Sequence, residues 1–155
     1  MNDLKRITRA VASAMMLSLV LTNPAWASDA DTLEENKRVV IAFYEAAIND
    51  KDFDKAAQYL GPHYIQHNPS APDGIEGLRG FIEFLRANFP TQRGEIKRVI
   101  AEDDLVVLHV HSTRDDGTPG RAIIDIFRVE DGKVVQHWDV IQDIPTNPAN
   151  DNGMF

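Results

Sequence analysis

Acidic and imidazole side chains recur along this chain at positions where an inert core would hold valine or leucine. Asp125 stands in a run of isoleucines, and the other members of the set are His67, His109, His137 and Asp139. A carboxylate in apolar surroundings has a raised pKa, which makes it a usable general base. A neighbouring imidazole donates to a developing oxyanion or carries a proton. The set therefore predicts proton abstraction next to a carbonyl group.

Side-chain alternation along the expected strands groups these residues by face. In one strand Asp125 shares a face with Ile123, Phe127 and Val129. In the next, His137 and Asp139 share a face, and Trp138 points to the other side. In an earlier strand His109 and His111 lie opposite Val106, Leu108 and Val110. No G-x-S-x-G motif and no phosphate-binding glycine loop is present, which argues against acyl and phosphoryl transfer.

Each residue also has a structural interpretation. Asp125 fits a carboxylate that caps a hairpin or pairs with Arg121 or Arg128. His109 and His137 fit hydrogen-bonded core histidines, and Trp138 fits a packing residue. His63 and His111 are expected at the surface.

His109-Val-His111 also fits a metal site, because an H-x-H pair on one strand face can chelate zinc. His67, His137 or an acid would supply the third ligand. No tight ligand triad is visible in the sequence, so a metal-free site is the preferred interpretation.

The elements that position these residues are three helices followed by four strands. Thr32 and Glu35 form a capping box that predicts a helix start, and Asp131-Gly132 predicts a tight hairpin. Helices are expected over 33–48, 53–60 and 75–88, a short extended piece over 64–67, a loop over 68–74, strands over 96–102, 105–113, 121–130 and 133–143, and an irregular tail over 145–155.

Helices followed by an antiparallel meander predict an α+β fold. One sheet and three helices enclose a core only if the sheet curls around the helices, which leaves a cone with an internal pocket. The 155 residues are 43% hydrophobic and contain no cysteine, which excludes disulfides and thiolate chemistry. The net charge of −8 argues against nucleic acid as a partner.

Residues 1–27 have the pattern of a secretory signal peptide. Lys5, Arg6 and Arg9 precede an apolar run over 10–21, and Ala25-Trp26-Ala27 is an A-x-A cleavage signal. The run is shorter than the ~20 residues of a membrane span. Cleavage after Ala27 would leave a domain over 28–155 with a charge of −10, in the periplasm or secreted, with no further membrane contact.

Three stretches together resemble the SnoaL-like polyketide cyclase family of the NTF2-like superfamily. They are Tyr64-Ile-Gln-His67-Asn-Pro69, Asp125-Ile-Phe-Arg-Val-Glu-Asp-Gly-Lys133 and His137-Trp-Asp-Val-Ile-Gln142. More narrowly, the chain is similar to bacterial proteins of the SnoaL-like aldol-condensation-catalysing group. The resemblance implies N-terminal helices cupped by a strongly curved antiparallel sheet, usually in a homodimer.

The resemblance also implies acid/base chemistry without metal or organic cofactor, with Asp125 as the acid/base and His67, His109 and His137 in the same cavity. The remaining pocket residues are then Tyr44, Tyr64, Phe127, Trp138 and Asp139. The expected reaction is aldol condensation, cyclisation or isomerisation of a small enolisable carbonyl compound. The alternative is a periplasmic module that binds a small molecule without chemistry, which the export signal favours because antibiotic cyclases are cytoplasmic.

Overall fold

The computed structural model describes residues 25–155, and most of the segment expected to be a signal peptide lies outside them. Helix α1 (Ala25–Tyr44) continues into a π-helical turn, η1 (Glu45–Asn49), and is followed by α2 (Phe53–Ala57) and α3 (Gly74–Asn88). The strands are β1 (Leu60–Gln66), β2 (Arg93–Glu102), β3 (Leu105–Thr113), β4 (Arg121–Glu130) and β5 (Lys133–Asp143). The α+β prediction is confirmed.

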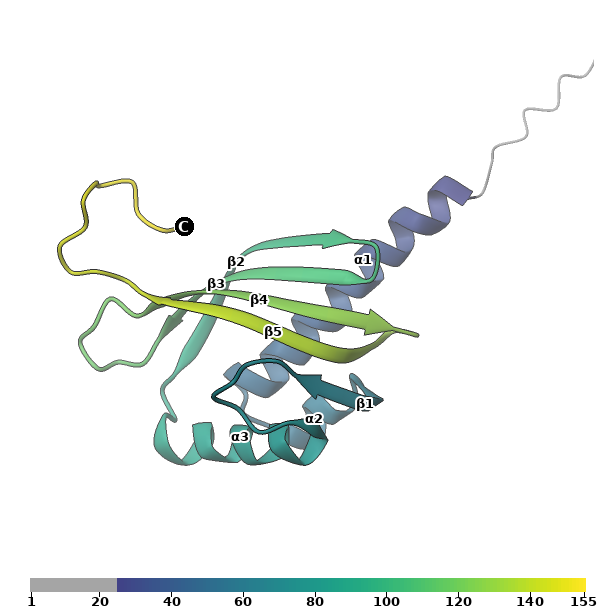
Figure 1. Cartoon of the computed structure of the whole chain (residues 1–155), viewed down its shortest axis with the longest axis horizontal. Coiled ribbons are helices and arrows are strands. Elements are labelled where there is room, and N and C mark those ends of the chain that lie inside the picture. The colour runs from purple at the N-terminus through teal and green to yellow at the C-terminus, as the bar shows by residue number, and fades with distance from the viewer. Residues whose placement is uncertain (1–24) are drawn as a thin grey trace, which may run out of the picture.

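One sheet contains all five of these strands, in the order β1-β5-β4-β3-β2. The pairs from β2 to β5 are antiparallel, as the meander predicted, and β3, β4 and β5 have the expected bounds. Asp131 and Gly132 both have positive φ, 50° and 69°, which is the backbone of the expected two-residue hairpin turn. Figure 1 shows the helices together on one side of the sheet, with α1 running behind the strands.

The expectations for the first half of the chain need three corrections. Helix α1 begins at Ala25, so Thr32 lies inside the helix rather than at its N-cap. Helix α2 ends at Ala57 instead of residue 60, and the extended piece expected at 64–67 starts at Leu60 as β1. Strand β1 pairs in parallel with β5, a contact between distant segments that no local pattern predicts. Pro62 is tolerated there because β1 is an edge strand.

The core lies between the helices and the inner face of the sheet. Strand β3 contributes Val106, Leu108 and Val110, which are completely buried, and α3 contributes Leu78, Ile82 and Leu85. These side chains recur every second residue on the strand and every three or four on the helix, as burial of one face requires. No helix within residues 25–155 is long and apolar enough to cross a membrane.

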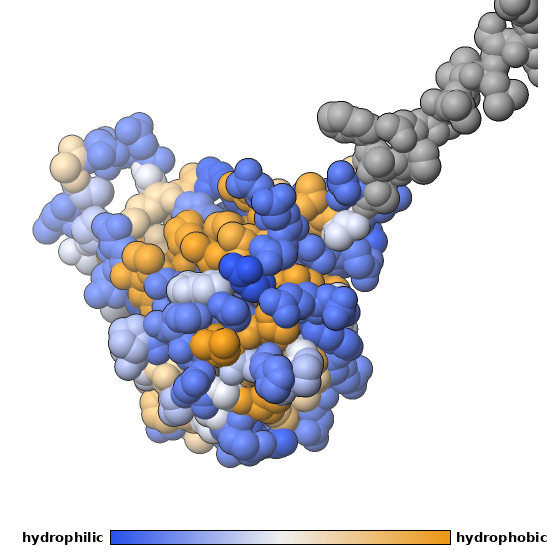
Figure 2. Space-filling model, turned by 45° about the vertical axis from the view of Figure 1, so that its right-hand side comes forward, coloured by the Kyte–Doolittle hydropathy of each residue, from blue (hydrophilic) through white to orange (hydrophobic). Residues whose placement is uncertain are grey.

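The outer face of the sheet also carries apolar side chains. Ile100 is 61% exposed and Val140 is 71% exposed, with Ile124 beside Val140 on the neighbouring strand. Figure 2 shows hydrophobic side chains gathered over the sheet, with hydrophilic residues around them. We call Ile100, Ile124 and Val140 the outer apolar patch.

Candidate active site

A cavity of about 210 Å³ lies between the helices and the inner face of the sheet. Its apolar wall comes mainly from Phe43 and Tyr44 of α1 and from Leu78, Phe81 and Leu85 of α3. Its polar side includes Gln66 and Asn68 at and after the end of β1, Asp125 of β4, and His137 and Asp139 of β5. An apolar cavity with a few convergent polar groups is the usual form of a small-molecule site.

Asp125 lies in the middle of β4 and faces this cavity. It pairs across the sheet with Leu108 on one side and Asp139 on the other, and only 5% of its surface is exposed. One carboxylate oxygen, Oδ1, lies 2.9 Å from Nε2 of His137. The other, Oδ2, is buried with no hydrogen-bond partner among the described residues. A buried oxygen without a partner costs free energy, and such positions are characteristic of functional sites.

The orientation of His137 follows from its second hydrogen bond. The backbone N–H of Asn68 can only donate, and it donates to Gln66 Oε1 at 2.9 Å, which identifies that atom as the acceptor. His137 Nδ1 lies 3.0 Å from the same oxygen, so Nδ1 carries a proton and donates. Nε2 therefore shares one further proton with Asp125 Oδ1: the pair is either imidazolium and carboxylate or neutral imidazole and carboxylic acid.

Burial raises the pKa of Asp125 above its ordinary value of 3.8. The hydrogen bond from His137 and the positive charge of that residue act in the opposite direction, and the carboxylate of Asp139 raises the pKa further. Desolvation is the largest of these causes, as expected for a carboxyl group against apolar side chains. Asp125 is therefore a general-base candidate whose protonation depends on His137.

Two tyrosines also line the cavity. Burial, and next the charge of Asp125, raise the pKa of Tyr44 and of Tyr64 well above the usual range, so both phenols stay protonated. Tyr64 accepts a hydrogen bond from Gln66 Nε2 at 3.1 Å. Tyr44 lies beside Gly94 of β2, whose missing side chain makes room for the phenol.

Asp125, His137 and Asp139 also form the group of described residues that could jointly hold a metal ion. One ligand atom from each lies within 4.8 Å of the others. A metal bound there would take His137 Nε2 away from Asp125, because Nδ1 is held by Gln66. Asp139 also accepts a hydrogen bond from Asn68 Nδ2 at 2.7 Å. The same three side chains thus allow either ion binding or proton sharing.

The structure brings some of the predicted site residues together and separates others. Asp125, His137, Asp139, Tyr44, Tyr64 and Phe127 line the cavity, as expected. His67 and Trp138 do not. Trp138 lies on the outer side of the sheet, and His67 is exposed and stacked on its ring at a centroid distance of 4.4 Å. The expectation that these two residues reach the pocket is wrong, because Trp138 alternates with His137 along β5.

His109 is also on the outer face, so its expected place in the cavity is wrong. It pairs with Ile124, while the neighbouring Leu108 faces inward and pairs with Asp125. His109 Nδ1 lies 2.9 Å from Arg98, and His111 Nε2 donates to the Pro119 carbonyl at 2.8 Å. Both rings contact Phe155 at centroid distances of 5.1 and 4.7 Å. The described residues bring no third histidine to this pair.

Several polar cavity residues were not among the predicted site residues. Gln66 and Asn68 orient His137 and Asp139, and Arg114 and Arg121 line the cavity near the loop between β3 and β4. Gln66 and Asn68 flank His67 in the stretch that resembles the family, so the stretch was identified but the wrong side chain was chosen. Arg121 shares the face of Asp125 by strand alternation, which was the available signal.

We expect Gly94→Ala to displace Tyr44 from the cavity. A Cβ atom at position 94 would collide with the Tyr44 hydroxyl group, and overpacking of this kind destabilises by about 1–3 kcal/mol. Urea unfolding measures this loss. Gly80→Ala on α3 is the matched control, because nothing lies within 4 Å of the added atom. Equal stability of the two variants would contradict the close approach.

Comparisons with known proteins agree with this architecture. Residues 40–137 match the protein family described as SnoaL-like domain. AclR from Streptomyces galilaeus, a proposed hydroxylase, superposes with a TM-score of 0.60 at 23% identity, covering 76% of this chain and 91% of its own. A proposed polyketide cyclase from Acidithiobacillus ferrooxidans gives 0.59 at 21% identity, covering 69% and 87%.

TsrD from Streptomyces laurentii is also similar, with a TM-score of 0.55 at 26% identity, covering 74% of this chain and 88% of its own. An NTF2-like protein from Cytophaga hutchinsonii gives 0.58 at 16% identity, covering 69% and 89%. A comparison with curated proteins finds no matching sequence.

Proposed function

The chain belongs to the SnoaL-like family, and from that premise we propose that it is an enzyme that moves a proton on a small enolisable carbonyl compound. One observation carries the proposal: Asp125 lines an apolar cavity with a buried, unpartnered Oδ2 while His137 holds Oδ1. Aldol condensation, cyclisation and isomerisation all begin with the proton transfer that such a carboxylate performs.

The positions of the protons on His137 and Asp125 suggest a role for each residue in the reaction. In the ion-pair form, His137 is an imidazolium that donates through Nδ1 to Gln66 and through Nε2 to Asp125 Oδ1. Asp125 Oδ2 then takes the proton from the carbon next to the substrate carbonyl, and an enolate forms as the C–H electron pair moves toward the carbonyl. The acid so produced returns its proton at the end of the reaction, which leaves the site unchanged.

The enolate oxygen needs a hydrogen-bond donor, and Tyr44 is the best placed. Its phenol is protonated, lines the cavity and has no hydrogen-bond partner among the described residues. A donor in a low-dielectric site stabilises developing negative charge more strongly than water does. We propose that Tyr44 binds the enolate oxygen, and that Tyr64 helps to hold Gln66.

Deuterium exchange tests the proposed function directly. The protein is incubated in D₂O with 5-oxo-5-phenylpentanoate or its methyl ester, and loss of the C4 proton signal is followed by NMR. We expect protein-dependent exchange that is saturable in substrate. Binding of these compounds without exchange would instead support a binding module that performs no chemistry.

We also propose that the protein is exported. The support is the basic start of the chain, the apolar run over 10–21 and the A-x-A motif at 25–27. Expression in a bacterial host should yield a periplasmic protein with Ser28 at its N-terminus, measured by intact mass. Leu19→Lys, which interrupts the apolar run, should retain the full chain in the cytoplasm. A periplasmic protein that still starts at Met1 would contradict cleavage.

We propose that two copies of the chain associate through the outer apolar patch. Exposed apolar side chains on one sheet face are typical of an interaction surface, and one face can pair with itself about a two-fold axis. Light scattering should give the mass of a dimer. Val140→Glu should shift the mass to that of a monomer, and Ala87→Glu, exposed on α3, should not. A dimer unaffected by Val140→Glu would place the interface elsewhere.

A further inference from the structure

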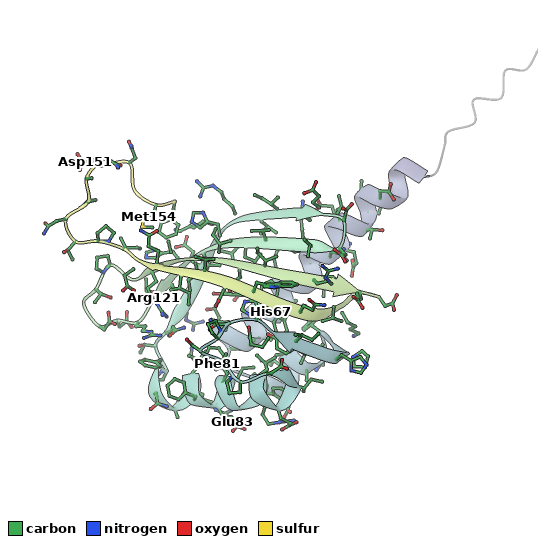
Figure 3. The ribbon with its side chains drawn as sticks, viewed as in Figure 1. His67, Phe81, Glu83, Arg121, Asp151 and Met154 are labelled. Atoms are coloured by element: carbon green, nitrogen blue, oxygen red, sulfur yellow. The ribbon has the colours of Figure 1, made fainter. Side chains whose placement is uncertain are left out.

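Two arginines line the same cavity near the loop that connects β3 to β4. Arg121 is the first residue of β4, on the face of Asp125, and Arg114 directly follows β3. Both side chains are half-buried. Figure 3 shows Arg121 at the end of the sheet beside the loop that connects β3 to β4, with Phe81 on α3 below it. The proton-transfer chemistry described above uses neither residue.

Neither guanidinium forms an ion pair within the described part of the chain. Asp143 pairs with Arg121 across the β4–β5 ladder and Asp116 lies in the loop after Arg114, yet none of their oxygens comes within 4.0 Å of a guanidinium nitrogen. The other described arginines without an ion pair, Arg86, Arg93 and Arg98, are exposed, whereas Arg114 and Arg121 are half-buried and line the cavity.

Arg114 is held in place for a further partner. Its Nε donates to Gln92 Oε1 at 2.8 Å, and its guanidinium lies 4.1 Å above the Phe89 ring. Gln92 is itself buried. Burial, and next the charge of Arg121, lower the pKa of Arg114, while the more weakly acting carboxylates of Asp116 and Asp143 raise it. The two guanidinium groups therefore repel each other. An anion between them would remove that repulsion and take the remaining N–H donors.

The distance between these arginines and Asp125 allows one ligand to contact both. Four residues along a strand separate the backbones of Arg121 and Asp125 by about 13 Å, and both side chains face the cavity between. Tyr44 lies in the field of both, because Asp125 raises the pKa of its phenol and Arg121 lowers it. Tyr44 lines the same cavity as the arginines and Asp125, so a ligand that spans them can contact its phenol.

We propose that Arg114 and Arg121 bind a carboxylate group of the substrate, which makes the substrate class oxo acids rather than neutral ketones or esters. The inference rests on the proposed function, because Asp125 must act on the carbon chain of the anchored acid. Arginine forms paired hydrogen bonds to a planar carboxylate, and the rest of the cavity is apolar enough for the carbon chain.

Binding of a matched acid and ester tests the anchor without any need for turnover. The probes are 5-oxo-5-phenylpentanoate and its methyl ester, titrated by calorimetry. We expect the acid to bind at least 10-fold more tightly than the ester. Arg121→Gln and Arg114→Gln should each weaken the acid by about 10- to 100-fold and change the ester by less than 2-fold. Arg121→Lys should give an intermediate loss.

Arg86→Gln is the control for charge alone, because Arg86 is exposed on α3 and outside the cavity, and it should leave both affinities within 2-fold. Unfolding midpoints confirm that each variant is folded. Equal binding of acid and ester, no binding of either, or an acid preference that survives both arginine substitutions would overturn the proposal.

Asp125→Asn distinguishes the proposed proton transfer from the proposed binding of a carboxylate by the two arginines. It should slow exchange by about 10³-fold while the acid preference remains. If the acid preference depends on the arginines but no variant or probe shows exchange, the anchor stands and the proposed reaction fails. If exchange is equal for acid and ester and independent of the arginines, the reaction stands and the anchor fails.

Discussion

Asp125→Asn should lower the rate of proton exchange at the substrate's α-carbon by about 10³-fold, within the 10²- to 10⁴-fold range of a positioned general base. The amide cannot accept the proton, yet it has the shape of the carboxylate and can still hydrogen-bond His137. Substrate binding should therefore change little. The measurement is the C4 deuteration rate at saturating substrate, with the dissociation constant determined alongside.

Asp139→Asn is the matched control, because Asp139 faces the same cavity and pairs with Asp125 across the sheet. Its carboxylate accepts a hydrogen bond from Asn68 rather than being free. We expect a loss below 10-fold. If Asp139→Asn removed activity and Asp125→Asn did not, the base would have been assigned to the wrong strand.

We expect Asp125→Asn to remain folded, and the pH dependence of its stability tests this expectation. Because the folded-state pKa of Asp125 is raised, its contribution to the free energy of unfolding falls as pH rises from 3.8 through the raised value. The asparagine variant has no such penalty. At pH 7 it should be at least as stable as the parent protein, and its advantage should shrink toward pH 4, as measured by urea unfolding.

His137→Phe should lower the exchange rate at neutral pH by about 10²-fold and move the acid limb of the pH–rate profile to higher pH. His137 lowers the pKa of Asp125 by a hydrogen bond and by its charge, so removing it leaves burial to raise the pKa further. The base is active only when deprotonated, and activity therefore falls as pH decreases through that pKa. The variant should recover part of its rate as pH is increased.

Phenylalanine preserves the ring that packs on Phe127 at a centroid distance of 4.7 Å, which limits the structural damage. His137→Gln, which retains a donor, should shift the acid limb less. His67→Phe is the control for loss of an imidazole outside the cavity, and its profile should match that of the parent protein. An acid limb at the same pH in His137→Phe would show that His137 does not control the base.

The second half of the chain was well predicted because its signals are local. The Asp131-Gly132 turn and the alternation of side chains delimit β4 and β5 at the residues where the structure has them. The same alternation placed Asp125 on one face with Phe127, and His137 with Asp139. Those pairs line the cavity, since cross-strand partners share a face.

His109 shows where local reasoning stops. Alternation correctly separated His109 from Leu108, but it does not say which of the two faces meets the helices. In the structure, Val106, Leu108 and Val110 are fully buried and face the helices, and Leu108 pairs with Asp125 on the same face of the sheet. Burial of three aliphatic side chains stabilises this orientation far more than burial of two imidazoles would.

Local sequence patterns also could not predict the contacts of Gln66 and Asn68, because their partners are distant in the sequence. They meet His137 and Asp139 across 71 residues of sequence because β1 pairs in parallel with β5. Parallel pairing carries no turn signal in the chain, so the hydrogen bonds that orient His137 appear only in the folded protein.

The amino-acid sequence by itself determined the α+β class, the limits of β3, β4 and β5, and which residues share a face within each strand, because periodicity and turn residues act over short distances. The register shift between Arg128 and Val129, which only the structure shows, pairs Asp125 with Asp139 and brings these residues and His137 to one side. Only the tertiary structure decided which face encloses the cavity, that His67, His109 and Trp138 lie outside it, and that two unpaired arginines lie inside. Those outcomes depend on how distant strands and helices share buried area and hydrogen bonds, which no short segment encodes.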